Sequence, residues 1–151
     1  MSITAYDASN WRNIPPDAQA IFPWADGRYA YSHARFPKAR YRYLTALGDP
    51  GADIADFEPG CIWPGSKLRL WAEERKDQHP QDDLTVYTDR DNYPLALDAL
   101  TGFTWHLFLA TQDGSAPTTW EGRPVRAVQI TDHDDLYDVD EVFDVDWLNR
   151  P

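Results

Sequence analysis

Residues 53–58, Asp-Ile-Ala-Asp-Phe-Glu, form a short apolar run that ends in two acids and is stopped by Pro59-Gly60. A run of this length, bounded by turn residues, predicts a buried β-strand. Because side chains alternate along a strand, Asp56 and Glu58 lie on one side and Phe57 on the other. The sequence therefore predicts two carboxylates side by side at the C-terminal end of a buried strand.

Strand-like and helix-like segments alternate on both sides of this stretch. The other expected strands cover residues 3–7, 27–32, 41–47, 84–88, 103–110, 125–130 and 139–143. The expected helical pieces cover residues 17–22, 33–39, 66–78 and 92–100. Strands that alternate with helices are typical of a parallel sheet with helical crossovers.

The chain length limits how complete such a fold can be. The 151 residues contain no repeat or linker, so we expect a single domain over residues 1–151. A complete eight-stranded (β/α) barrel usually needs about 200 residues or more. We therefore expect an α/β fold that is a compact, trimmed (β/α) TIM-like barrel with short or missing helices. An open α/β sheet is the alternative.

Two further acids are expected to join the pair. If the sheet closes, its first and last strands are neighbours, and Asp7 and Asp140 reach the same mouth. Crowded carboxylates suit glycosidic hydrolysis, because one is held protonated as the acid while another stabilises positive charge. The alternative is that Asp7 starts a turn with Ser9, that Asp140 belongs to an acidic tail, and that the Asp56/Glu58 pair is a coincidence.

Aromatic residues close to these acids predict a sugar-binding surface, since sugar rings stack on aromatic faces. The candidates are Trp11, Trp63, Tyr87 and Trp105. The alternative is that these side chains fill the core.

Composition excludes several classes of partner. With 25 acidic and 14 basic residues, the net charge of −11 repels nucleic acid and anionic lipid. The basic residues between Arg28 and Arg42 are interpreted as a solvated face, as is the acidic tail over residues 132–146, which lacks the spacing of a calcium loop.

No cofactor or metal is expected. The histidines lack zinc-ligand spacing, the lone Cys61 cannot complete a cysteine cluster, and no phosphate-binding glycine motif is present. The N-terminus has neither a basic nor an apolar signal region, and no apolar stretch approaches the ~20 residues that span a bilayer. We expect a protein made in the cytoplasm without a signal peptide and without membrane insertion, with a virion as a candidate location.

The order of the motifs resembles the glycoside hydrolase family 25 lysozymes and the related glycoside-hydrolase-like TIM barrels of phages and actinobacteria. The segments that carry the resemblance are Tyr6-Asp7-Ala8-Ser9-Asn10-Trp11, Ile54-Ala55-Asp56-Phe57-Glu58, Val86-Tyr87-Thr88, Trp105-His106-Leu107, Val128-Gln129-Ile130 and Val139-Asp140-Glu141-Val142-Phe143. They follow the family's order across nearly the whole chain.

The resemblance implies a role for each acid. Glu58 would be the acid/base, Asp56 would position the substrate N-acetyl group as internal nucleophile, and Asp7 and Asp140 would shape the charge of the site. Gln129 would contact substrate. The implied function is a lysozyme-like hydrolase, or its glycan-binding descendant, acting on cell-wall peptidoglycan and encoded by a phage. The alternative is a non-catalytic virion, tail or assembly protein that binds other virion proteins through the barrel.

The presence or absence of an open groove beside Glu58 distinguishes these two hypotheses. A hydrolase needs Glu58 within reach of such a groove, whereas an assembly module would have the mouth filled or covered by a partner.

Overall fold

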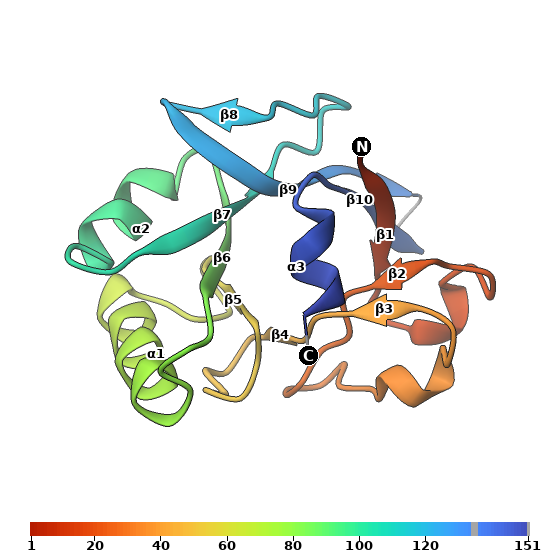
Figure 1. Ribbon diagram of the computed structural model, residues 1–151, viewed down its shortest axis with the longest axis horizontal. Coiled ribbons are helices and arrows are strands. Elements are labelled where there is room, and N and C mark those ends of the chain that lie inside the picture. The colour runs from red at the N-terminus through yellow and green to blue at the C-terminus, as the bar shows by residue number, and fades with distance from the viewer. Residues whose placement is uncertain (134–135, 151) are drawn as a thin grey trace.

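The computed structural model describes residues 1–133 and 136–150, and its main feature is one curled sheet (Figure 1). Within the described residues, ten strands form a mixed half-barrel in the order β3-β2-β1-β10-β9-β7-β6-β5-β4, with β8 paired to β9. Only three short α-helices accompany them. The expected (β/α) TIM-like barrel is therefore wrong, because helices do not alternate with the strands.

The strands are β1 (Ile3–Asp7), β2 (Ala20–Ile21), β3 (Arg40–Tyr41), β4 (Leu44–Thr45), β5 (Ile54–Asp56), β6 (Leu84–Asp89), β7 (Trp105–Ala110), β8 (Thr119–Trp120), β9 (Arg123–His133) and β10 (Tyr137–Val142). The helices are α1 (Gly65–Gln78), α2 (Tyr93–Ala99) and α3 (Val145–Asn149), with 3₁₀ turns η1 (Trp11–Asn13) and η2 (His33–Arg35).

The middle of the chain forms the elements that its pattern predicts. In α1 the buried positions Leu68, Trp71, Ala72 and Arg75 follow helical spacing and face the sheet. The parallel strands β6 and β7 are almost continuously buried, which explains their unbroken apolar runs. The pattern fails closer to the N-terminus.

The expected helix over residues 17–22 and the expected strand over 27–32 are both absent. Ala20, Ile21 and Phe22 are fully buried, and Ile21 pairs with Tyr6 in a parallel ladder, so tertiary packing overrides the helical signal. Residues after Gly27, which has φ +79°, form turns instead of a strand. Among the described residues, the connections before and after β2 contain only the 3₁₀ turns η1 and η2.

The last strand runs opposite to expectation. β9 ends at His133 and β10 begins at Tyr137, and so short a connection permits only antiparallel pairing. β10 is also antiparallel to β1, which makes the sheet mixed rather than parallel.

The two edges of the sheet approach each other. β3 and β4 stand at opposite ends of the strand order, yet only two residues separate Tyr41 from Leu44, so the sheet must curl. Leu44 N donates to Pro23 O (2.8 Å) and Ala25 N donates to Leu44 O (2.7 Å), beside a parallel bridge between Trp24 and Leu44.

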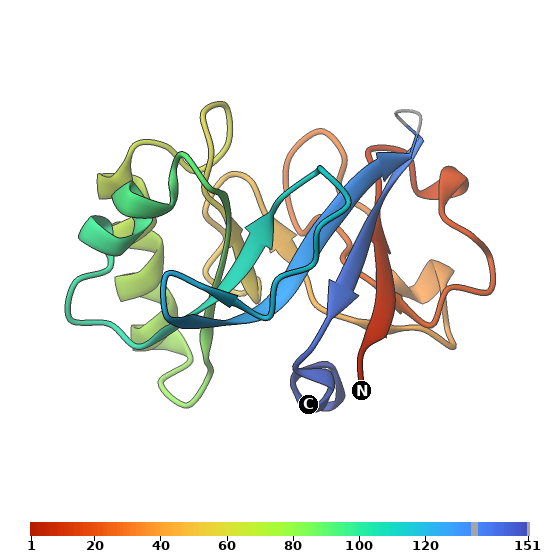
Figure 2. The same cartoon turned by 90° about the horizontal axis from the view of Figure 1, so that it is seen from above.

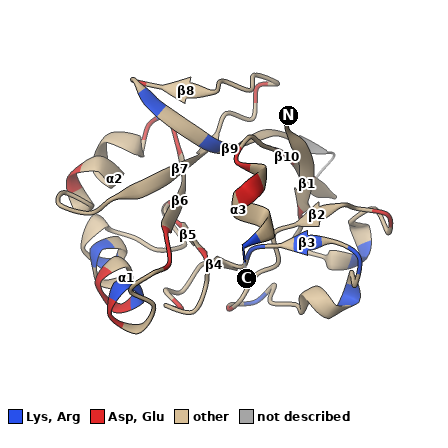
Figure 3. Ribbon diagram, viewed as in Figure 1, with Lys and Arg blue, Asp and Glu red and all other residues tan. Residues whose placement is uncertain are grey.

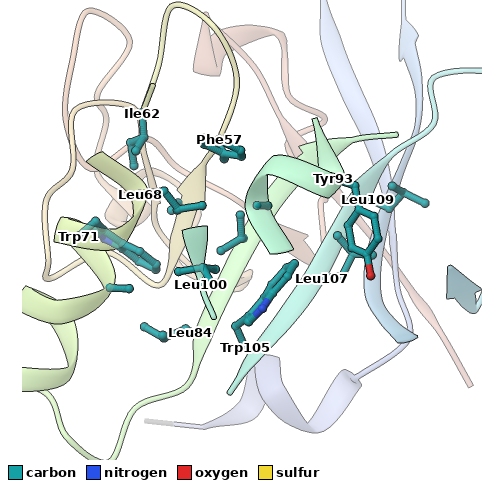
Figure 4. Packing of buried hydrophobic residues seen from close by; sticks show 14 of the residues in the cluster. Phe57, Ile62, Leu68, Trp71, Leu84, Tyr93, Leu100, Trp105, Leu107 and Leu109 are labelled. Atoms are coloured by element: carbon teal, nitrogen blue, oxygen red, sulfur yellow. The ribbon is translucent and has the colours of Figure 1, made fainter. Parts of the chain in front are cut away.

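The core has an outer and an inner part. The outer part lies between the sheet and helices α1 and α2, and includes Leu68, Trp71 and Leu107 (Figure 4). The inner part fills the curl, where Phe22 packs against Phe108 and Trp147. Helix α3 carries Trp147 and lies at the same end of the molecule as the N-terminus (Figure 2). The start of β1 is thus at the α3 end.

Candidate active site

An open cleft of about 460 Å³ lies where β1 and β5 end. Its lining residues include five carboxylates and a single basic side chain: Asp7, Asp26, Asp56, Glu58, Asp138 and Arg28. The predicted acids Asp7, Asp56 and Glu58 thus come together, although the sheet that holds them differs from the expected barrel.

Asp56 and Glu58 occupy one wall of this cleft. Asp56 is the last residue of β5 and is 2% exposed, while Glu58 is half-buried. Between them, Phe57 N donates to Tyr87 O (2.9 Å), which fixes the chain against β6. Burial and then the charge of Glu58 raise the pKa of Asp56 well above its ordinary value. Burial also raises the pKa of Glu58, against a hydrogen bond with Asp56 that lowers it.

Asp138, and not Asp140, faces Asp7 at the mouth. In the antiparallel register Asp7 pairs with Asp138 and Ala5 with Asp140, so Asp140 lies deeper in the curl. Asp140 is 0% exposed and both its carboxylate oxygens lack a hydrogen-bond partner. Burial, followed by the charge of Asp140, raises the pKa of Asp7; burial, followed by the charge of Asp138, raises that of Asp140. Asp140 therefore lies beneath the cleft, where its charge raises the pKa of Asp7.

Tyr87 and Gln129, both predicted to contact substrate, form a hydrogen-bonded pair on the cleft lining. The Tyr87 hydroxyl donates to Gln129 Oε1 in a short hydrogen bond, and Gln112 Nε2 donates to the same oxygen (3.0 Å). Burial, then the charge of Glu58, raises the pKa of Tyr87. Gln112 has φ 53°, a left-handed conformation that is uncommon outside glycine.

The three predicted tryptophans do not line the cleft. Trp63 stacks on Phe57 in the outer core (5.2 Å between ring centroids), and Trp105 is 5% exposed in the same cluster. Trp11 packs on Phe36 at η1, away from the acids. The aromatic side chains at the cleft are instead Trp24, Tyr29 and Tyr87.

Asp26 is a cleft residue that sequence analysis missed. Its carboxylate accepts hydrogen bonds from the Thr45 hydroxyl and from the amides of Ala46 (2.9 Å) and Leu47 (3.2 Å). The Asp-Gly pair at residues 26–27 is a turn signal that could have marked it. These bonds fix Asp26 against Ala46 and Leu47 on the cleft lining.

Cys61 also borders the cleft. A carboxylate oxygen of Asp56, one of Glu58 and the Cys61 Sγ lie within 4.8 Å of one another, so this group could hold a metal ion. Burial and the neighbouring carboxylates raise the pKa of the Cys61 thiol to about 12.

The charged segments have mixed outcomes. Arg42 is 8% exposed and donates to the carbonyls of Trp147 and Arg150, so it does not belong to a solvated face. In the acidic tail, Asp144 caps α3, while Asp134 and Asp135 lie outside the described residues. Among the described residues, no helix is long and apolar enough to cross a membrane.

Comparisons of the chain with protein-family models, curated proteins and solved structures return no match. The resemblance to family 25 lysozymes therefore gains no support from them and stays a prediction, as do peptidoglycan as substrate and a phage origin. The site has to be interpreted from its own chemistry.

Proposed function

We propose that the chain is a glycoside hydrolase that uses Glu58 as acid/base and Asp56 as its partner. One observation carries the proposal: two neighbouring carboxylates with raised pKa values border an open cleft. A carboxyl group that stays protonated near neutral pH can donate a proton to a leaving oxygen.

The two groups have different access to substrate. Glu58 is the more exposed of the pair and can reach a bound ligand, whereas Asp56 is nearly enclosed and can orient Glu58 or a polar group of the substrate. Tyr87 and Gln129 add hydrogen-bonding groups beside them. The cleft volume lies in the range of about 300–1,000 Å³ that is usual for small-ligand sites.

The close spacing of the pair argues against inversion of configuration. Their nearest oxygens lie within 4.8 Å. Retaining enzymes hold the two carboxyl groups about 5–5.5 Å apart, whereas inverting enzymes need about 6.5–9.5 Å to admit a water molecule. Asp56 would then support a nucleophile on the substrate or act as one itself.

Clearing of a peptidoglycan suspension by the purified chain tests the proposal, with chitin oligosaccharides as a second substrate. The product anomer, followed by NMR, tests retention. Wild-type protein and Glu58→Gln are compared, with Glu73→Gln on the exposed side of α1 as the matched control. Absent or equal hydrolysis by wild type and Glu58→Gln removes the hydrolase proposal; cell-wall binding without clearing favours the glycan-binding descendant.

A further inference from the structure

Three potential metal ligands, two carboxylates and one thiol, meet on the Glu58 wall of the cleft. The turn after β5 brings them together: Cys61 N donates to Glu58 O (3.0 Å), and this places Cys61 Sγ 3.9 Å from Glu58 Oε1. Asp56, at the end of β5, completes the group, in which every pair of donor atoms lies within 4.8 Å.

The Cys61–Glu58 distance is close to that of a tetrahedral metal centre, and the other two donor-atom distances are at most 4.8 Å. With Zn–S of about 2.3 Å and Zn–O of about 2.1 Å, tetrahedral ligands lie roughly 3.6 Å apart for sulfur and oxygen and roughly 3.4 Å apart for two oxygens. The observed Cys61–Glu58 separation exceeds the first value by a few tenths of an ångström. Side-chain rotations that bring the three donor atoms together would complete the group around an ion.

A second observation points to a missing ligand. Asp56 is 98% buried and borders the cleft, yet its Oδ1 has no hydrogen-bond partner in the described part of the chain. Leaving a buried carboxylate oxygen unpaired is costly, and a bound cation would remove that cost. The cleft lining also favours cations, because its five carboxylates outnumber its one arginine.

We propose that Asp56, Glu58 and Cys61 bind a borderline divalent cation, of which Zn²⁺ fits best, and that water occupies the fourth position facing the cleft. A thiolate combined with carboxylates favours Zn²⁺ over Mg²⁺ and Ca²⁺, which prefer oxygen ligands alone. On binding, the thiol proton is released to solvent and sulfur bonds to the metal. This goes beyond the proposed function: the ion would occupy both carboxylates and inhibit hydrolysis.

Co²⁺ is the spectroscopic probe, because thiolate ligation gives a charge-transfer absorption that oxygen ligands do not. We expect this band in the wild type, its displacement by Zn²⁺, and its loss in Cys61→Ser. Calorimetric titration with Zn²⁺ should show binding weakened by about 10-fold or more in Cys61→Ser and Asp56→Asn, since each loses one of three ligands. Glu73→Gln should bind as wild type does, even with excess Ca²⁺ present.

Absence of the thiolate band would overturn the proposal, as would equal Zn²⁺ binding by wild type and Cys61→Ser, which would place the metal on surface acids. Thermal unfolding without metal checks that the variants fold, and Cys61→Ala is the second cysteine variant. Metal binding is measured without substrate. A chain that binds Zn²⁺ but does not hydrolyse glycan when metal-free therefore contradicts only the proposed function.

Discussion

At or beneath the cleft, Asp7, Asp56 and Asp140 are buried without an ion-pair partner among the described residues, whereas Asp53 and Asp83, which precede β5 and β6, face buried arginines. Asp53 stands before β5 and Asp56 ends it, so only two residues separate a paired acid from an unpaired one. Figure 3 shows basic segments on β9 and β3 on either side of α3 (Figure 3).

The paired end has the features of a structural network. Arg126 has a side chain that is 2% exposed and contacts Asp83 and Asp144 at 3.0 Å each, while its Nη1 donates to Thr85 Oγ1 (2.8 Å). Buried charges that are paired and hydrogen-bonded hold a fold together, whereas unpaired buried carboxylates cost stability. The contrast supports the proposal that the unpaired end is the functional one, since perturbed acids in a cleft are typical of active sites.

The largest difference between the two ends is expected in the rate of hydrolysis when one carboxylate is removed at each end. We expect Glu58→Gln to lower the rate of glycan hydrolysis by about 10²-fold or more, the usual effect of losing a general acid. Asp83→Asn, at the paired end, should change the rate by less than about 3-fold because it touches no cleft residue. Initial rates on one substrate check both, and a comparable loss in the two variants would break the comparison.

Removing an arginine should have its larger effect at the paired end, and the effect is on stability instead of activity. Arg126→Met removes the ion-pair partner of Asp144 and the buried partner of Asp83, which keeps Arg150 and His106 beside it, so we expect a loss of roughly 2 kcal/mol in the free energy of unfolding. Arg28→Met, at the exposed rim of the cleft, is the matched control and should cost under about 0.5 kcal/mol. Urea unfolding of both variants at pH 7 gives the answer; a stable Arg126→Met would show that the network contributes little.

Asp140→Asn should stabilise the protein at neutral pH. The folded-state pKa of Asp140 is raised, so its favourable contribution is complete below its unfolded pKa of about 3.8 and is lost as pH rises towards the folded pKa. Since one pKa unit corresponds to about 1.4 kcal/mol, we expect a gain of at least that size at pH 7 and a smaller gain at pH 4. Unfolding curves at both pH values measure it, and a gain that does not depend on pH would contradict this cause.

The smallest effect is expected from lowering the pH, and it concerns Asp83 at the paired end. Although burial opposes it, the hydrogen bond and charge of Arg126 lower the pKa of Asp83. Its contribution is therefore present above pH 3.8 and lost as pH falls through the folded pKa, the opposite direction to Asp140. Lowering the pH from 5 to 2.5 should reduce the free energy of unfolding of the wild type by under about 1 kcal/mol more than that of Asp83→Asn, because this carboxylate is partly exposed. Unfolding curves at the two pH values measure the difference.

The sequence predicted the centre of the fold well. Residues 53–58, 66–78 and 84–88 carry clear periodicity between strong turn residues, and β5, α1 and β6 follow them closely. It also placed Asp7, Asp56 and Glu58 in one cleft. Local pattern was enough for these elements and for the Asp56/Glu58 pair, because side-chain orientation follows from the strand itself, whereas Asp7 joined them through the expected closure of the sheet.

The other features depend on contacts between distant segments. Pairing with β1 makes Ala20-Ile21 a strand, and the short β9–β10 connection makes the last strand antiparallel, which puts Asp138 at the mouth and Asp140 beneath it. Whether Trp63 and Trp105 meet sugar or core was likewise set by packing. The chain by itself determined which carboxylates stand at a strand end. Only the tertiary structure decided which of them lost their counter-charges, because burial and pairing are properties of neighbours far apart in sequence.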